Sequence, residues 1–195
     1  MKKVSLIFLL FSLMSIDGFA QLKNEMILSY GYANNDIIMN EDIIGDMGFA
    51  GRKTFLLEAG YQRKLNNSFS FESGFAYSKS EIVYNYFPSG VLNTKKLEIN
   101  LMSFPIGVNF NFLKYFYINA GTIIDFELGR PSDQVTYDQS GFGFYGGVGA
   151  KYSIRNFTVK INPFIIEHSS IPFEKEKYNQ RLLEKGVRIG VGFNF

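Results

Sequence analysis

The chain has 195 residues, of which 46% are hydrophobic and 17% aromatic, and its formal net charge is +2. The absence of cysteine excludes disulfides and thiol-bound metals. The near-neutral charge argues against a nucleic-acid-binding protein, and after the amino-terminal segment no apolar run is long enough for a membrane-spanning helix.

The first segment, residues 1–20, has the three parts of a secretory signal peptide. It has a basic start, a short apolar core over residues 4–16, and small residues near its end. That core is shorter than the ~20 residues that a membrane-spanning helix needs, which favours a cleaved signal over an anchor. We therefore expect cleavage after Ala20 and one exported domain over residues 21–195.

From residue 25 onward, apolar and polar residues alternate in eight segments with the period of a β-strand. In each segment one parity carries Phe, Tyr, Leu, Ile or Val, and the other carries Gly, Ser, Asn or charged residues. The predicted strands are residues 25–33, 54–65, 68–86, 96–112, 115–128, 139–154, 157–166 and 186–195.

Short and long connections alternate between these strands. The short turns are residues 66–67, 113–114 and 155–156, and the longer gaps are residues 34–52, 87–94, 129–138 and 169–181. This alternation is typical of a bacterial outer-membrane barrel, with short periplasmic turns and longer extracellular loops. We predict an all-β, eight-stranded antiparallel up-and-down transmembrane barrel.

The last ten residues bear on which face of the barrel points outward. Val187, Ile189 and Val191 alternate with polar or glycine positions, and the sequence finishes on Phe195. A soluble, lipocalin-like barrel is the alternative, and it would turn the same apolar residues inward. The polar parity is rich in glycine, which suits a narrow lumen, and aromatic residues cluster near strand ends. We therefore predict that the apolar face meets lipid.

In the fourth predicted strand the parity of the apolar residues changes. Leu97, Ile99 and Leu101 have odd numbers, whereas the apolar residues from Phe104 onward have even numbers. If all of them face outward, the strand requires a β-bulge near residues 102–103. A nearby proline supports a local break in the ladder there.

The polar parity places charged residues in the predicted lumen. These are Glu58, Glu72, Asp125, Glu127, Lys64, Lys151, Lys160 and Arg188. Each unpaired charge would cost several kcal/mol in so narrow a space, so we expect the charges to pair. An eight-stranded barrel is just wide enough for side chains to fill it. The balance of signs predicts a packed lumen, and a narrow small-solute channel, in which one sign would be in excess, is the alternative.

Residues 141–146 match the pattern G-x-G-x-x-G. A dinucleotide site needs that pattern between a strand and a helix, and here it lies inside a predicted strand with no helix after it. We expect these glycines to leave room for Tyr145 and other bulky lumen side chains.

Four stretches resemble the PorT-like outer-membrane β-barrel family. They are Leu-Met-Ser-Phe-Pro-Ile-Gly-Val-Asn-Phe at residues 101–110, Tyr-Ile-Asn-Ala-Gly at residues 117–121, the glycine-rich residues 141–152, and the last strand with its terminal Phe. The resemblance spans residues 21–195. It implies a Bacteroidetes-type outer membrane and recognition of the last strand by the barrel-assembly machinery. The residues of that assembly signal are Val191, Phe193 and Phe195. One family member serves a protein-secretion system, and no residue here marks this chain as that member.

An enzymatic alternative rests on His168, the single histidine, and on Ser170. Their spacing, followed by a Glu, is similar to the catalytic arrangement of outer-membrane lipid A deacylases, in which His takes the Ser proton and a carboxylate orients the His. The resemblance implies Ser170 as nucleophile and His168 as base. The candidates for the carboxylate are Glu174, Glu176 and Glu184. Ile171 stands where that family has Asn, and strand parity turns His168 inward.

The first long gap, residues 34–52, mixes four acidic with six large apolar residues. The acidic spacing fits no EF-hand calcium loop, and so many apolar residues favour a lid or a surface for an envelope protein partner. The charge run at residues 174–177 is most simply solvated. We therefore expect a non-enzymatic barrel without cofactor or metal, with outer-membrane lipid as its surroundings and a binding, adhesion or envelope-complex role for its outer loops.

Overall fold

The computed structural model describes residues 24–39, 48–86, 93–130, 136, 138–174 and 180–195. The strands within them are β1 Asn24–Met39, β2 Gly48–Lys64, β3 Phe69–Tyr86, β4 Asn93–Phe112, β5 Phe116–Glu127, β6 Gly141–Ile154, β7 Phe157–Pro172 and β8 Gln180–Asn194. No helix in this part of the chain is long and apolar enough to cross a membrane.

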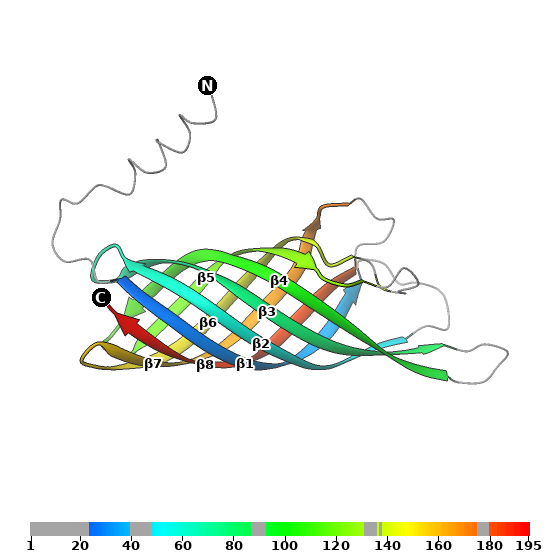
Figure 1. Cartoon of the computed structure of the whole chain (residues 1–195), viewed down its shortest axis with the longest axis horizontal. Coiled ribbons are helices and arrows are strands. Elements are labelled where there is room, and N and C mark those ends of the chain that lie inside the picture. The colour runs from blue at the N-terminus through cyan, green and yellow to red at the C-terminus, as the bar shows by residue number, and fades with distance from the viewer. Residues whose placement is uncertain (1–23, 40–47, 87–92, 131–135, 137, 175–179) are drawn as a thin grey trace, which may run out of the picture.

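The eight strands form one closed antiparallel barrel (Figure 1). Each strand pairs with the next in sequence, and β1 pairs with β8 to close the ring. At this seam the Asn24 amide donates to the Phe195 carbonyl at 3.0 Å, and the Phe195 amide donates back at 2.9 Å. Closure removes free strand edges from the body of the barrel. The predicted eight-stranded up-and-down barrel is confirmed.

The three short turns lie at one end of the barrel, which is also where β8 ends (Figure 1). In the β2–β3 turn, the Asn66 side-chain oxygen accepts hydrogen bonds from the amides of Ser68 and Phe69, at 2.8 and 2.7 Å. The other two turns contain Leu113 and Arg155, with φ of 55° and 54°. We call this the short-turn end, and the opposite end the long-loop end.

The apolar parity faces outward, as predicted. On β8, Ile189 and Val191 are 55% and 52% exposed, whereas Arg188 is 9% exposed. A soluble lipocalin-like barrel would have the opposite sense, so that alternative is wrong. The outward residues form a continuous apolar belt around the wall, and the chain is a transmembrane barrel.

Aromatic rings border this belt at the short-turn end. Phe157 and Phe193 pack edge to face with their centroids 5.3 Å apart, and Tyr115 stacks on Tyr152 at 6.0 Å. Such a girdle is the usual boundary of a barrel at the membrane surface.

The predicted bulge near residues 102–103 is wrong. The β3–β4 register runs without a shift from Ser73 opposite Ile106 to Ser80 opposite Ile99. Ile99 and Leu101 are fully buried in the lumen. The error came from assigning every apolar residue of this strand to the lipid face.

Several strands extend further toward the long-loop end than the sequence predicted. β1 continues to Met39 instead of residue 33, and β8 begins at Gln180 instead of residue 186. In the extensions of β1 and β8, exposed outward residues such as Asp36 and Lys185 are polar, and the inward residues Ile37 and Leu182 are apolar. A wall with a polar outside and an apolar inside is what water on the outside requires, so this part of the barrel stands beyond the bilayer.

The register shifts at two other places. One lies in β2 between Gly51 and Thr54, where a Cβ on Gly51 would come within 1.5 Å of a backbone carbonyl. The other lies in β7, opposite residues 142–144 of β6, where Ser169 has a φ of 52°. This second bulge turns Ser169 into the interior next to His168, which is inward by the regular alternation.

Candidate functional site

The lumen holds most of the polar groups that the sequence singled out, and they form three groups along the barrel. A mixed charge network occupies the half nearer the short turns. A histidine between two carboxylates lies nearer the long loops. An apolar cluster closes the long-loop end.

The ion pair of Lys160 lies nearest the short-turn end. The Lys160 ammonium donates to Glu25 Oε2 and to Gln62 Oε1, both at 2.7 Å. The Lys160 and Glu25 side chains are each 10% exposed. Sequence reasoning placed Lys160 in the lumen but missed Glu25, although the outward parity of β1 implies an inward Glu25.

Arg188 is the next cation along the lumen. Its Nη1 contacts Glu58 Oε2 at 2.5 Å, and its Nε donates to Asn162 Oδ1 at 2.7 Å. The guanidinium also lies 5.6 Å from the centre of the Phe164 ring. Arg188 and Glu58 are two of the eight predicted lumen charges, and they contact each other directly.

Glu72 is surrounded by neutral donors. Tyr145 donates its hydroxyl to Glu72 at 2.6 Å, Asn119 donates at 3.1 Å, and Asn109 also donates to it. Three donors satisfy a buried carboxylate without a cation in direct contact.

His168 occupies the lumen nearer the long loops, between Asp125 and Glu184. Its Nδ1 lies 2.9 Å from Asp125 Oδ2, and its Nε2 lies 3.5 Å from Glu184 Oε2. Ser103 donates to Asp125 at 2.5 Å, and Ser80 donates to Glu184 at 2.8 Å. All three ionisable side chains are at most 1% exposed. His168 lies on the inward parity of β7, as the alternation predicted, but its place between two carboxylates was not predicted.

The remaining predicted lumen charges lie nearer the ends. Glu127 is half-buried near the long loops and accepts a hydrogen bond from the Gln139 amide at 2.8 Å. Lys64 is exposed at the short-turn rim. Lys151 is half-buried and donates to the Asn111 side-chain oxygen.

Apolar side chains fill the lumen at the long-loop end. We call this group the outer cluster, and it consists of Ile37, Ile82, Ile99, Leu101 and Leu182, with Met39 packed against it. Four of its members are 0% exposed. A second apolar group, which includes Leu56 and Ile123, lies elsewhere in the lumen. Neither group was predicted from the sequence.

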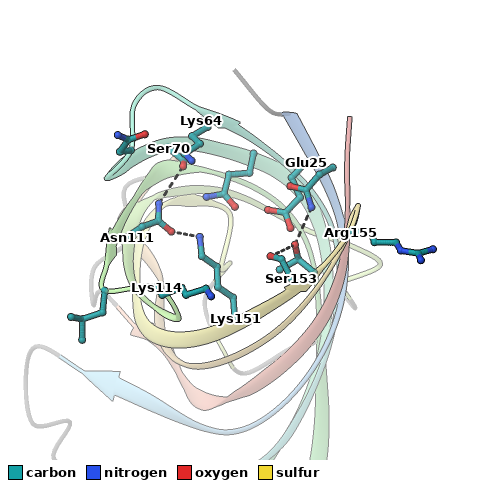
Figure 2. A pocket seen from close by; sticks show the side chains of 13 residues that line it. Glu25, Lys64, Ser70, Asn111, Lys114, Lys151, Ser153 and Arg155 are labelled. Atoms are coloured by element: carbon teal, nitrogen blue, oxygen red, sulfur yellow. Dashed lines mark hydrogen bonds between the residues drawn. The ribbon is translucent and has the colours of Figure 1, made fainter. Parts of the chain in front are cut away.

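Space remains in the lumen mainly at the short-turn end. A cavity of about 290 Å³ opens there and reaches in to Glu25 and Gln62 (Figure 2). Further in, beside Arg188 and Glu72, the free volume is only about 40 Å³.

The deacylase arrangement is not assembled in the described part of the chain. Ser170 donates its hydroxyl to Glu167 at 3.0 Å, and both ring nitrogens of His168 face carboxylates. Glu184 does lie beside His168, but in a fully buried setting, and Glu174 is exposed. Glu176 lies outside the described residues.

The glycines of β6 leave room for lumen side chains. A Cβ on Gly149 would lie 2.4 Å from the Tyr117 ring, and one on Gly143 would lie 2.8 Å from Ile123. On Gly146, by contrast, the nearest atom would be 3.7 Å away. The room for Tyr145 comes instead from Gly107 and Gly121 of β4 and β5, where a Cβ would lie 2.3 and 2.7 Å from Tyr145. The G-x-G-x-x-G match lies inside a strand.

The other predicted features have simple placements. Val191, Phe193 and Phe195 of the predicted assembly signal all point outward and are exposed. Of the first long gap, residues 40–47 lie outside the described residues, whereas residues 34–39 belong to β1 and residues 48–52 to β2. The described residues contain no group of three acidic or histidine side chains suited to a metal ion.

No protein-family model matches the chain, and no curated protein matches it. Several solved structures are similar to it, and two of them are outer-membrane or surface proteins of other bacteria. OprG from Pseudomonas aeruginosa has a TM-score of 0.53 at 12% identity, over 93% of this chain and 99% of that one. Neisserial surface protein A has a TM-score of 0.50 at 14% identity, over 91% of this chain and 100% of that one. These likenesses establish the fold of an eight-stranded outer-membrane β-barrel.

Proposed function

We propose that this protein is a non-conducting barrel of a bacterial outer membrane that acts by binding at its long-loop end, as an adhesion or envelope-complex component. The outer cluster carries the proposal. Ile82, Ile99 and Leu182 fill the lumen with fully buried apolar side chains, and dehydrated apolar constrictions block ions. Because ions and solutes cannot cross a filled lumen, we place the function of the barrel at its ends.

Features of the two chain ends and of the first loop complete the proposal. Residues 1–20 direct export, and the barrel-assembly machinery recognises Val191, Phe193 and Phe195 in the last strand. The PorT-like resemblance supports a Bacteroidetes-type outer membrane. An envelope protein partner binds through the apolar first loop. Co-purification from the native envelope tests this, because the double variant Ile43→Ser and Ile44→Ser should lose the partner that the wild type retains.

Conductance in planar bilayers tests the closed lumen. We expect no discrete current steps from the purified full chain, because the outer cluster and the charge network together block the lumen. Ion steps that change in size when Glu72 is replaced by Gln would contradict the proposal and favour the narrow channel.

The lipid A acyl hydrolase remains the second candidate, and the geometry disfavours it because the Ser170 hydroxyl is bonded to Glu167. Mass spectrometry of lipid A from cells expressing the wild type and Ser170→Ala separates the two functions. Identical acylation in both, and in cells without the protein, supports the non-enzymatic role. A loss of acyl chains that requires Ser170 would overturn it.

A further inference from the structure

The cavity at the short-turn end is lined by cations that have no acidic partner. Four basic residues line it, namely Lys64, Lys114, Lys151 and Arg155, against the single carboxylate of Glu25. Glu25 is already bound by a fifth cation, Lys160, at 2.7 Å. Among the described residues, none of the four lining cations forms an ion pair, so the cavity has a strong excess of positive charge.

The three lysines among these four residues lie around one opening, and the pairing of the strands places them there. Lys64 pairs in register with Ser70, whose hydroxyl lies 3.4 Å from Asn111 Nδ2, and Asn111 in turn accepts from the Lys151 ammonium. Figure 2 shows Lys151 reaching across the inside of the ring toward Asn111, while Arg155 points away from it.

Lys114 belongs to the same opening. The Lys151 amide donates to the carbonyl of Tyr115 at 2.7 Å, which places Lys114 one residue from that contact. Ser153 and Thr158 add two hydroxyls to the wall, 2.9 Å from each other. The lining thus combines ammonium groups with neutral hydrogen-bond donors.

Gathered lysines repel one another, and partial burial strengthens the repulsion, so a bound anion stabilises the charged form of the arrangement. Among the lining residues that the structure describes, Glu25 is the single acidic side chain, and Lys160 already binds it. A ligand from solution can supply the negative charge that balances the lysines.

We propose that this cavity binds a soluble, phosphate-bearing small molecule that enters from the short-turn end. The ammonium group of lysine is a compact point charge that suits phosphate oxygens, and the hydroxyls can donate to the same group. The volume of about 290 Å³ is near the lower limit of small-molecule pockets. A lipid phosphate is the other source of this chemistry, but Lys151 lies inside the ring, where an intact lipid in the bilayer does not reach.

The test is a titration of the full mature barrel with inorganic phosphate, in maltoside micelles at constant ionic strength. Amide signals of ¹⁵N-lysine report each site. We expect a saturable shift at Lys64 and Lys151 and none at Lys53, an exposed lysine at the far end of the same strand β2. Acetate at the same ionic strength should bind more weakly than phosphate, because it carries less negative charge.

Substitutions identify the cavity as the site. Lys151→Gln and Lys64→Gln should each weaken phosphate binding about tenfold, the loss of one charged hydrogen bond, while Lys53→Gln leaves it unchanged. Lys64 is exposed at the rim, so its variant folds even if the Lys151 variant does not.

Three results would overturn the inference. The first is phosphate binding that is equal in Lys64→Gln and wild type, and the second is acetate binding as tight as phosphate binding. The third is the same Lys151 shift in nanodiscs containing phosphatidylglycerol without added phosphate, which would assign the site to lipid. None of these bears on conductance, so this inference and the proposed function fail independently.

Discussion

Replacing Arg188 with Met is expected to lower the free energy of unfolding by about 3–5 kcal/mol, the usual cost of breaking a buried ion pair. The Arg188 and Glu58 side chains are 11% and 17% exposed. Without the guanidinium, Glu58 keeps its charge in a poorly hydrated lumen, and Asn162 Oδ1 loses its donor. Urea unfolding of the barrel in lipid vesicles measures the change.

The matched control is Lys79→Met on the outer wall. Lys79 and Glu98 form an ion pair at 2.9 Å, but their side chains are 42% and 51% exposed. We expect a loss of about 1 kcal/mol or less there. Adding Glu58→Gln to Arg188→Met should recover much of the lost stability, because no unpaired charge remains. If Arg188→Met costs no more than Lys79→Met, the pairing of lumen charges does not stabilise the barrel.

Replacing His168 with Leu is expected to have an effect of similar size, about 3–5 kcal/mol. His168 stands between Asp125 and Glu184, and all three side chains are almost fully excluded from solvent. Its removal leaves two carboxylates facing each other across an apolar side chain. The same vesicle unfolding measurement applies.

Ser170→Ala serves as the comparison for His168. Ser170 is half-buried and donates one hydrogen bond to Glu167, so its loss should cost about 1 kcal/mol. The triple variant His168→Leu with Asp125→Asn and Glu184→Gln should be more stable than His168→Leu alone. A His168→Leu protein as stable as wild type would show that this group does not hold the lumen together.

The alternation of residues was enough to predict the strand number, the outward face and the inward position of Arg188 and Glu58, but not that these two residues pair. It was enough because lipid on the outside and a narrow lumen inside impose opposite demands on successive side chains. Those demands act along the whole membrane-spanning part of each strand, so the pattern there is regular.

The same rule failed where the wall leaves the bilayer. Ile99, Leu101 and Leu182 are apolar because they fill the lumen, while Lys185 beside them is polar because it meets water. The alternation of apolar and polar residues alone does not show where along a strand the membrane boundary lies. The change from apolar to polar residues at outward positions, such as Tyr32 to Asn34 on β1, was the available signal.

Two further features lay beyond sequence reasoning for local reasons. The bulge that turns Ser169 inward next to His168 depends on a positive φ at Ser169, and nothing in the sequence predicts that backbone conformation at a non-glycine residue. The cationic cavity depends on which strand ends meet around one opening, since Lys64 ends β2, Lys114 lies in the turn between β4 and β5, and Lys151 lies within β6.

Lipid quenching at single cysteines is the most direct test of the outward apolar belt. The chain has no cysteine of its own, so Leu28→Cys and Ile189→Cys each carry one fluorescent label, with Leu113→Cys in a short turn as the control. Brominated lipid tails should quench the labels at 28 and 189 strongly and the label at 113 weakly, while aqueous iodide should do the reverse. Labels at 28 and 189 that iodide reaches and brominated lipid does not would contradict a barrel whose apolar face lies in the membrane.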